Sequence, residues 1–286
     1  MKLRVLLLSI VVLLCSSVFN NVSAQSKAPK SKTYYSNKVI VLMYHHIDAE
    51  ESGATISPAR FGTHLKLLHD RGYNVISSEQ FYRFMLHKEK VPDNAVVITF
   101  DDGYDSYRKY AVPLMDKYNM VGTHFIIGQS SDKHNVATAH LTWDTMRKLK
   151  EKGHSFYSHT YNLHNYANLN EKGTKTGPLL THRIYVNELG RIETASEYKK
   201  RITDDLTLME QRLQEELDNE YGMIAFPYGA YNDTVKTALK KLDVKLFFTI
   251  KPGINKAGSD EVYRLNAGTP KMTANKFVEL LKKYHD

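Results

Sequence analysis

Residues 95–103 read AVVITFDDG, a strand pattern that runs straight into two carboxylates and a glycine. The run from Ala95 to Phe100 has the length and the β-branched content of a buried strand. In parallel α/β folds, active sites gather at the carboxyl ends of the strands. Asp101 and Asp102 are therefore candidate active-site residues with different roles, in which one binds a metal and the other accepts a proton. An ordinary Asp-Asp-Gly turn that caps the next helix is the alternative.

Outward from this strand, short apolar segments alternate with amphipathic ones. Strand patterns occupy residues 39–43, 95–100, 123–127, 154–158, 223–226, 244–250 and 262–265. Helical patterns occupy residues 61–69, 78–86, 107–118 (despite Pro113), 142–150, 197–217, 233–242 and 273–284, with Ser78 and Thr142 as expected N-caps. Strands separated by helices at this rhythm indicate parallel βαβ units in a barrel or a doubly wound sheet.

One stretch, residues 165–196, breaks this rhythm because it is long and polar and contains Gly177-Pro178. Within it, residues 183–192 have the pattern of a hairpin. A loop of this length inside a compact domain is usually a functional lid or a disordered excursion. It would shape specificity if it covered a substrate groove, and it would have no role if it were merely mobile. The sequence leaves both readings open.

The first 24 residues have the features of a secretory signal peptide. A basic start precedes an apolar run over residues 5–14, and Val22-Ser23-Ala24 offers small residues for cleavage before Gln25. The apolar run is about half of the roughly 20 residues that span a bilayer, so we expect a secreted, extracellular or cell-wall-associated protein without a membrane anchor.

After this signal segment, the Lys- and Ser-rich residues 25–37 are expected to be a flexible tether, followed by the folded chain at residues 38–286. The single cysteine, Cys15, lies inside the signal segment, so the mature chain has no disulfide. Leu14 before it lacks the small size that a lipoprotein signal needs. About 260 mature residues suit one α/β barrel or two small domains.

The chain carries 39 basic and 31 acidic side chains, a net charge of +8. Removing the two bases of the signal segment leaves 37 against 31, or about +6. Such a surface favours peripheral association with an anionic cell wall or membrane, although a modest positive charge also simply aids solubility. Lys and Arg are spread along the chain without a basic tract, which argues against a nucleic-acid partner.

A pair of histidines, His159 and His164, follows the strand predicted at 154–158. Two imidazoles five residues apart can converge on one cation where a strand passes into a loop. With one aspartate they make a three-ligand set for Zn²⁺ or a similar borderline metal, leaving positions for water and substrate. The chain has 13 histidines, so a chance pair is the alternative.

Two further strand ends carry polar groups. His45 and His46 follow the first strand, and one of them would face a barrel mouth while the other faces away. At Phe226-Pro227-Tyr228-Gly229, the turn can aim a backbone N–H at a developing oxyanion, and Tyr228 can line a sugar site. Taken alone, the first motif could equally be a histidine buried in the core, and the second an ordinary Pro-Tyr-Gly turn. Four such strand ends in one chain favour an active site.

Together these motifs resemble those of the polysaccharide deacetylases of carbohydrate esterase family 4, the group with the NodB-homology domain. Thr99-Phe100-Asp101-Asp102-Gly103 is similar to the first motif of the family, and His159-Thr160 with His164 is similar to the second. Phe226-Pro227-Tyr228-Gly229 is similar to most of the third. The resemblance covers roughly residues 39–265.

The resemblance implies an α/β fold, a deformed (β/α)7 barrel, as a single catalytic domain over residues 38–286. It implies Asp102, His159 and His164 as the metal ligands and Asp101 as the general base. The oxyanion would meet the backbone N–H of Tyr228, between Pro227 and Gly229.

The chain departs from the common family pattern in three places. Ala225 stands where the third motif usually has an arginine, Arg264-Leu265-Asn266 stands where a Leu-x-His motif usually supplies the general acid, and the fourth-motif tryptophan is not evident around residues 244–250. The branch that acts on poly-β-1,6-N-acetylglucosamine shows similar losses and carries its acid histidine early, in a Tyr-His motif. Tyr44-His45 matches that placement, which implies His45 as the acid and His46 as its outward neighbour.

The expected activity is therefore metal-dependent N-deacetylation of an extracellular N-acetylglucosamine polymer, with the β-1,6-linked polymer favoured. Zinc is the expected metal, with cobalt, nickel or manganese as alternatives. Peptidoglycan is the second substrate candidate and acetylxylan the third. A non-catalytic sugar-binding or adhesion protein on the same fold, and a hydrolase of a non-carbohydrate amide, are the alternatives of a different class.

Overall fold

The computed structural model describes residues 32–133 and 137–286. The predicted signal peptide at 1–24, with Cys15, and the first part of the predicted tether, residues 25–31, lie outside the described residues. Among the described residues, no helix combines the length and the apolar character needed to cross a bilayer.

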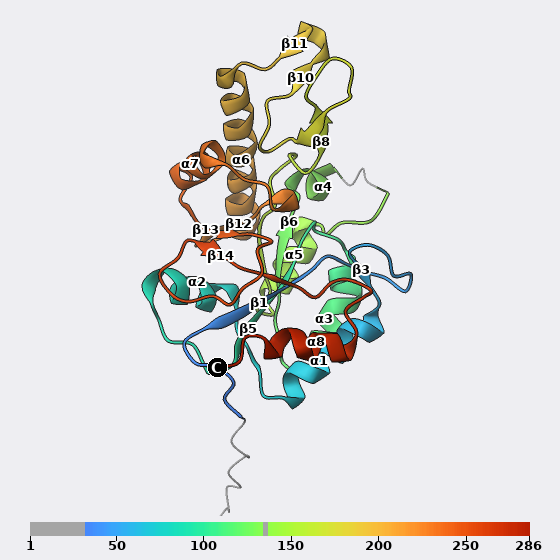
Figure 1. Ribbon diagram of the computed structural model, residues 1–286, viewed down its shortest axis with the longest axis vertical. Coiled ribbons are helices and arrows are strands. Elements are labelled where there is room, and N and C mark those ends of the chain that lie inside the picture. The colour runs from blue at the N-terminus through green and yellow to red at the C-terminus, as the bar shows by residue number, and fades with distance from the viewer. Residues whose placement is uncertain (1–31, 134–136) are drawn as a thin grey trace, which may run out of the picture. The chain divides into compact units, whose positions relative to one another are not determined.

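One parallel sheet organises the chain from Lys32 to Asp286 (Figure 1). Its strands run in the order β14 (Glu261–Val262), β13 (Val244–Phe248), β12 (Gly222–Ala225), β7 (Ser155–Ser158), β6 (Thr123–Ile126), β5 (Ala95–Phe100), β1 (Val39–Tyr44) and β15 (Leu265–Asn266), with the short β4 (Asn74–Val75) paired to β5. All of these pairings are parallel.

The two ends of this path, β14 and β15, are separated in the chain by Tyr263 and Arg264 alone. The sheet therefore curls until its ends meet, and β14 with β15 fills the seventh strand position. The predicted deformed (β/α)7 barrel in a single domain is confirmed. The prediction of one strand over residues 262–265 is wrong, because the N–H of Arg264 donates to the carbonyl of Lys251 at 3.0 Å and interrupts the ladder.

Helices and short helical turns surround the curled sheet. They are α1 (Pro58–Asp70), α2 (Ser78–His87), the π-helical η1 (Tyr107–Ala111) with α3 (Val112–Asp116), α4 (Gly128–Lys133), α5 (Trp143–Lys150), α6 (Ala195–Leu217), the 3-10 turn η3 (Pro227–Gly229), α7 (Asp233–Lys241) and α8 (Ala274–Lys282). The predicted helix at 107–118 is divided, because Pro113 lacks the N–H that a continuous ladder needs. A short parallel pair, β2 (His46–Ile47) with β3 (Thr55–Ile56), completes the barrel part.

Two predicted helix starts have different outcomes. Thr142 is confirmed as an N-cap, with its side chain accepting the N–H of Thr145. The cap of α2 is Ser77 rather than Ser78, because Ser77 has the extended backbone of a cap and forms a capping box with Gln80. Ser78 is instead buried, with its hydroxyl against Thr123.

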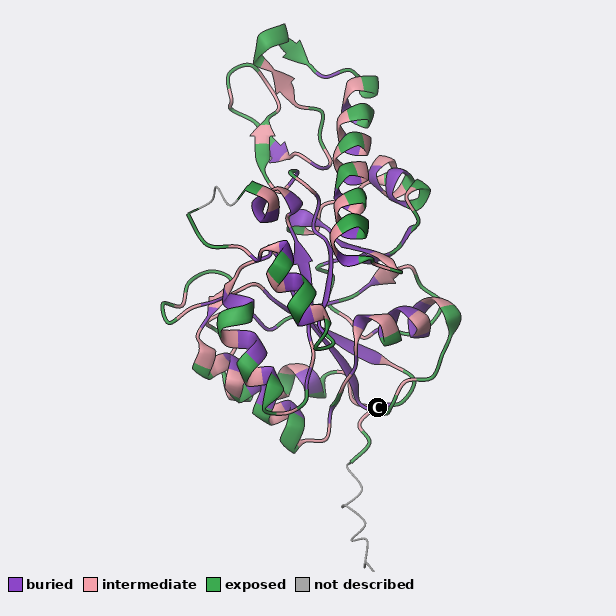
Figure 2. Cartoon of the chain, turned by 180° about the vertical axis from the view of Figure 1, so that it is seen from behind, coloured by how far each residue is buried: buried purple, intermediate pink, exposed green. Residues whose placement is uncertain are grey.

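Successive residues of the central strands enter different cores, since strand side chains alternate between the two faces. In β5, Val96, Ile98 and Phe100 pack toward the surrounding helices, whereas Ala95 and Val97 pack inside the curl. Helix α2 contributes apolar side chains to the inner cluster and so fills the barrel from one end. Figure 2 shows the sheet as almost entirely buried, with the exposed helix faces turned outward.

The packed chain begins before the boundary predicted at residue 38. Tyr35 is 1% exposed, and its hydroxyl donates to the carbonyl of Ala95 at 2.9 Å. The side chain of Asn94 accepts the N–H of Tyr34 at 2.7 Å. The polar composition of residues 25–37 conceals these two aromatic anchors, so the prediction of a flexible tether is wrong for its last residues.

Residues 165–196 form a folded excursion beside the N-terminal half of α6 (Figure 1). Two antiparallel pairs build it, β8 (Tyr166–Asn168) with β9 (Thr176–Pro178), and β10 (Tyr185–Val186) with β11 (Arg191–Ile192). The 3-10 turn η2 (Asn187–Leu189) joins the second pair. The hairpin predicted at 183–192 is confirmed, and the reading of this stretch as a disordered excursion is wrong.

An ion pair between the excursion and α6 holds this part of the chain in place. Glu193 is 5% exposed and accepts both Nε and Nη2 of Arg201, at 2.7 and 2.9 Å. The same guanidinium donates to the carbonyls of Leu179 and His182. Charge-assisted bidentate bonds of this kind fix relative orientation, so the excursion is a packed wall above the barrel.

One carboxyl group on α6 is buried without an ionic partner. Oε1 of Glu210 has no hydrogen-bond partner among the described residues. Burial raises the pKa of Glu210 to about 8, and the Ser158 hydroxyl lowers it only in part. Glu210 is therefore protonated at neutral pH.

We predict that Glu210→Gln stabilises the protein increasingly as the pH rises. The folded-state pKa lies above the unfolded value of about 4.3, so wild-type stability falls as the pH rises from about 4 to about 8. Glutamine stays neutral, so the unfolding free energy of the variant relative to wild type should grow across this window. Urea unfolding at about pH 5, 7 and 9 measures it, with the exposed Glu215→Gln as control. A difference that does not change with pH would contradict the prediction.

Candidate active site

In the turn after β5, the neighbouring carboxylates of Asp101 and Asp102 contact different partners. The N–H of Asp101 donates to the Tyr44 carbonyl at 3.0 Å and so continues the ladder with β1. Asp102 then takes a φ of 77°, which few non-glycine residues adopt. Buried His124 of β6 braces the turn, with its Nε2 2.9 Å from the N–H of Gly103 and 3.0 Å from the Asp101 carbonyl. This strained, braced turn fixes the positions of both carboxylates.

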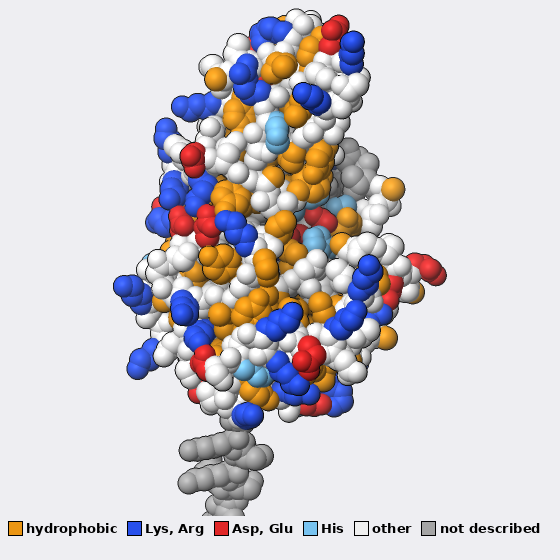
Figure 3. All heavy atoms as spheres, in the orientation of Figure 1, with side chains coloured by type: hydrophobic (Ala, Val, Ile, Leu, Met, Phe, Trp, Pro, Cys, Tyr) orange, Lys and Arg blue, Asp and Glu red, His pale blue; other side chains and the backbone are white. Residues whose placement is uncertain are grey.

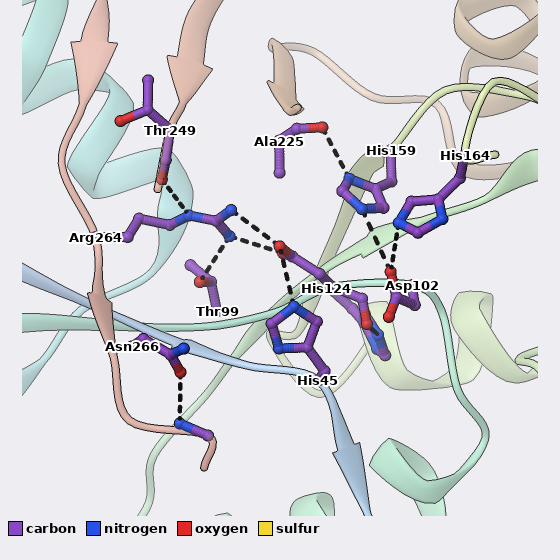
Figure 4. Close-up of polar contacts among 12 residues, drawn as sticks. His45, Thr99, Asp102, His124, His159, His164, Ala225, Thr249, Arg264 and Asn266 are labelled. Atoms are coloured by element: carbon purple, nitrogen blue, oxygen red, sulfur yellow. Dashed lines mark hydrogen bonds and ion pairs between the residues drawn. The ribbon is translucent and has the colours of Figure 1, made fainter. Parts of the chain in front are cut away.

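Three side chains at the barrel mouth form a candidate metal centre. Asp102, His159 and His164 each offer one ligand atom, and these atoms all lie within 4.8 Å of one another. Asp102 Oδ1 is 3.4 Å from His159 Nε2 and 3.2 Å from His164 Nε2, and Figure 4 shows both rings turned toward it. One carboxylate and two imidazoles are a donor set that suits Zn²⁺ with positions left open. The structure thus brings together the three ligands that the resemblance implied.

Hydrogen bonding and charge prepare these groups for a cation. His159 Nδ1 lies 2.8 Å from the carbonyl of Ala225, which can only accept, so Nδ1 keeps a proton and Nε2 is the nitrogen that can bind a metal. Burial would raise the pKa of Asp102, but the histidines His159 and His164 outweigh it and hold the pKa of this carboxyl well below its usual range. One carboxylate oxygen beside two imidazole nitrogens fits the divalent metal that the resemblance implied.

The loop between the two histidines is held from α6. Thr160 has a positive φ of 70°, which reverses the chain directly after the first histidine. Asp205 then accepts the N–H groups of Tyr161 and Asn162, at 3.0 and 2.8 Å. These contacts explain how two histidines five positions apart face the same point.

Asp101 is held by an arginine inside the barrel. Nη1 and Nη2 of Arg264 donate to its two carboxylate oxygens at 2.7 and 2.9 Å, and Nε donates to the carbonyl of Thr249 at 2.8 Å (Figure 4). Arg264 is 1% exposed and Asp101 3%. Burial would raise the pKa of Asp101, but the paired guanidinium of Arg264 keeps that pKa below its ordinary value. Asp101 is therefore ionised at neutral pH, as a proton acceptor must be.

His45 approaches Asp101 from the end of β1. Its Nε2 is 4.0 Å from Asp101 Oδ2, and its Nδ1 is buried without a hydrogen-bond partner among the described residues. His46 does not line the cavity between these strand ends and packs edge-on against Tyr104, with ring centroids 4.7 Å apart. The two histidines thus lie as the resemblance implied, while the role of His45 as the acid stays a prediction.

The turn after β12 forms another side of the mouth. Tyr228 has a positive φ of 58°, and the N–H of Gly229 donates to the Phe226 carbonyl at 2.8 Å. The N–H of Tyr228 itself donates to none of the described residues, so it is free to meet an oxyanion. The Tyr228 ring lies 4.5 Å from the His164 ring. A side chain at position 229 would collide with Ile250, so this turn requires glycine.

A cavity of about 180 Å³ joins these strand ends. It is lined by His45, Asp101, Asp102, His159, His164, Phe226, Tyr228, Gly229 and Ile250. Ligand pockets usually exceed about 300 Å³, so this one suits a single small group such as an acetamido arm. Inside it, one carboxylate can take a proton, one imidazole can give a proton, and three side chains can hold a cation.

Three residues of this arrangement carry no motif signal. Arg264, His124 and Asp205 act through contacts with strands or loops far away in the sequence. The one available signal for Arg264 is a lone charge inside the strand pattern at 262–265. Asn266, in the region of the missing acid motif, accepts the N–H of Gly268 at 3.1 Å within its own turn and lines no part of the cavity.

Comparison with known proteins places the motifs in one family. Residues 88–247, 160 of the 286 in the chain, match the family model described as Polysaccharide deacetylase. The matched range contains both carboxylates, both metal-site histidines and the turn after β12. It excludes His45 on one side and Arg264 on the other.

Two relatives and one solved structure are similar over most of this chain. The poly-beta-1,6-N-acetyl-D-glucosamine N-deacetylase of Staphylococcus aureus (strain N315) is 26% identical, over 92% of this chain and 90% of that protein. The Escherichia coli (strain K12) protein of the same name is 26% identical over 77% of this chain, which spans only 35% of that protein. A de-N-acetylase from Aggregatibacter actinomycetemcomitans superposes with a TM-score of 0.75 at 28% identity, covering 84% of this chain and 99% of that one.

We predict that Arg264→Met lowers kcat/KM for amide hydrolysis by about 100-fold, because Asp101 loses its bidentate support. Without the guanidinium, the pKa of Asp101 rises, so the acidic limb of the pH–rate profile should move to higher pH. Arg60→Met breaks a bidentate pair with Glu51 outside the cavity and is the control. An acidic limb that stayed at the wild-type pH would show that Arg264 does not control the base.

A separate prediction concerns the metal. His159→Ala should weaken zinc binding by more than about 100-fold, because it removes one of three ligands. Calorimetric titration of the zinc-stripped protein measures this, with the exposed His182→Ala as the matched histidine control. Zinc affinity equal to wild type in His159→Ala would place the metal elsewhere.

Proposed function

The chain belongs to the polysaccharide deacetylase family, and we propose that it is a secreted, metal-dependent enzyme that deacetylates poly-β-1,6-N-acetylglucosamine. Family membership makes the chain a hydrolase of N-acetyl amide bonds. The observation that carries the finer proposal is one buried cluster, in which Asp101 is paired with Arg264 beside the ligand Asp102 and beside His45.

The residues of the cluster divide the chemistry of hydrolysis. A divalent metal held by Asp102, His159 and His164 would polarise the acetamide carbonyl and make water more acidic. Asp101, kept ionised, takes the proton of the attacking water. The N–H of Tyr228 donates to the carbonyl oxygen as it gains negative charge. A proton from His45 then goes to the departing nitrogen, so the products are acetate and a free amine.

Support for the β-1,6-linked polymer comes from the relatives and from the position of the acid. Two relatives at 26% identity are named for this polymer, although the chain spans only 35% of the Escherichia coli one. The candidate acid, His45, comes from the end of the first strand, as the sequence resemblance to that branch implies. Its Nε2 lies 4.0 Å from Oδ2 of Asp101, the candidate base.

Secretion, surface association and the metal are parts of the same proposal. The signal-peptide pattern at residues 1–24 supports export, and a charge of about +6 after cleavage supports loose association with an anionic wall or membrane. Two imidazoles and one carboxylate favour zinc, with cobalt, nickel or manganese as substitutes.

A non-catalytic, sugar-binding use of the fold is the alternative of a different class. The main reason to consider it is Ala225, which stands where the family usually has an arginine. Arg264 reaches Asp101 from the segment between β14 and β15, so the carboxylate is paired although position 225 has no arginine. A base that is buried, ionised and supported in this way favours an active enzyme over a retired one.

Acetate release from the purified residues 25–286 tests the proposed function. We predict zinc-dependent release from β-1,6-linked N-acetylglucosamine oligomers, faster than from β-1,4-linked oligomers or peptidoglycan fragments. Asp101→Asn and His45→Ala should each lower turnover by about 100-fold or more with zinc still bound. His46→Ala, at the neighbouring residue that does not line the cavity, is the matched control for His45.

Each outcome has one meaning. Preference for β-1,4-linked oligomers or for peptidoglycan fragments would indicate that the substrate is a cell-wall polymer. No release from any of these by the zinc-loaded protein would contradict the proposal. Full activity of Asp101→Asn would exclude that residue as the base.

A further inference from the structure

We infer that Tyr166 of the excursion, together with Tyr228, forms a preformed subsite for a second sugar ring of the polymer. This inference rests on the proposed function, because it concerns the substrate of the same site. It assigns a task to the excursion, which supplies none of the side chains that line the cavity.

The two rings continue outward from the metal ligands. The Tyr228 ring lies 4.5 Å from the His164 ring, and the Tyr166 ring meets Tyr228 edge-on at 4.7 Å with an interplanar angle of 61°. Tyr166 begins β8 only two residues after His164. The side chains thus form a continuous row from the candidate metal centre to the excursion.

The side chains of both tyrosines are exposed to solvent, although aromatic rings are usually buried in a folded protein. Tyr166 is 55% exposed and Tyr228 is 41% exposed, and Ile250 beside the cavity is 51% exposed. In Figure 3, hydrophobic side chains gather between the barrel and the excursion, around the hollow in which histidine and acidic side chains are visible. Contiguous exposed apolar surface next to a site usually marks a place where a ligand binds.

The size of the cavity explains why a second surface is needed. A volume of about 180 Å³ accepts the acetamido arm of one sugar, so the neighbouring sugar of a polymer must lie outside it. Two rings that meet edge-on form a corner, which offers one aromatic face and one hydroxyl-bearing edge to a pyranose. Tyrosine suits this task because its ring packs against C–H groups while its hydroxyl reaches a polar partner.

The corner is built before any ligand arrives. The N–H of Leu179 donates to the Asn165 carbonyl at 2.9 Å, which ties the end of the first hairpin to the start of β8. The Tyr198 hydroxyl of α6 donates to the Leu180 carbonyl at 3.0 Å. With the Glu193–Arg201 pair, these bonds hold the excursion against α6. Binding to a surface that is already ordered costs little conformational entropy, so the Tyr166 ring contributes directly to affinity. Because Tyr166 lies outside the cavity with the candidate base and metal ligands, its loss should weaken binding more than it lowers turnover.

Other exposed aromatic and aliphatic side chains do not share this placement. Tyr263 is 40% exposed between β14 and β15, where its ring packs on Gly253 and lines no part of the cavity. Leu189 and Ile192 belong to the second hairpin of the excursion. Tyr263 is therefore a matched control for the loss of an exposed tyrosine.

The test compares Tyr166→Ala, Tyr166→Phe and Tyr263→Ala with wild type on β-1,6-linked N-acetylglucosamine di- and tetrasaccharides. In Tyr166→Ala, KM for the tetrasaccharide should rise about tenfold, while kcat falls less than about threefold. The advantage of the tetrasaccharide over the disaccharide should disappear in this variant. Tyr166→Phe should resemble wild type, because it keeps the ring. Tyr166→Thr, a strand-forming substitution, replaces the alanine variant if that one does not fold.

Calorimetric titration of the zinc-stripped proteins with the tetrasaccharide separates this inference from the proposed function. Binding about tenfold weaker in Tyr166→Ala than in wild type and Tyr263→Ala would support the subsite, even if no acetate is released. Equal tetrasaccharide binding and equal KM in wild type and Tyr166→Ala would overturn the subsite, even if the enzyme is active. Absence of tetrasaccharide binding in every protein would overturn it as well.

Discussion

The ion pair between Arg264 and Asp101 connects the point where the ends of the sheet meet to the end of the central strand β5. Arg264 lies where the last strand position divides into β14 and β15, and its guanidinium joins the carboxylate at the end of β5 to the Thr249 carbonyl after β13. Both charged groups are buried, so removing either would leave an unpaired charge inside the protein, which typically costs about 3–5 kcal/mol. One buried contact therefore links the divided last strand position to the candidate base at the end of β5.

Two adjacent carboxylates keep lowered pKa values at this mouth because each has its own basic partners. Asp101 is balanced by the guanidinium, and Asp102 by the two histidines of the candidate metal centre. The backbone has positive φ at Asp102, in the turn after β5, and at Thr160, in the loop between the two histidines. Such backbone is uncommon in ordinary turns and occurs where a fold must hold particular side chains in place. Both the neighbouring charged groups and the backbone geometry therefore distinguish Asp101, the candidate base, from Asp102, the candidate ligand.

The features that depend on neighbouring residues could be predicted from the sequence. Apolar runs locate the strands, and the histidines at 159 and 164 follow one of them, so their meeting with Asp102 follows from parallel strands ending at one mouth. The role of Arg264 could not be predicted, because its partner is 163 positions away and the contact exists only once the barrel closes. The bracing by Asp205 from 44 positions away has the same cause. Likewise, local pattern predicts the hairpin at 183–192 but not the packing of the excursion on α6.

The central claim is that the ends of β5 and β7 assemble a single metal site beside a separate, arginine-supported base. Anomalous diffraction at the zinc edge from crystals of the zinc-loaded protein tests this most directly. The account predicts one peak, about 2.0–2.2 Å from an Asp102 carboxylate oxygen and from Nε2 of His159 and His164, with Asp101 still paired to Arg264. A peak at another set of residues, or zinc bound by Asp101 in place of Asp102, would contradict it.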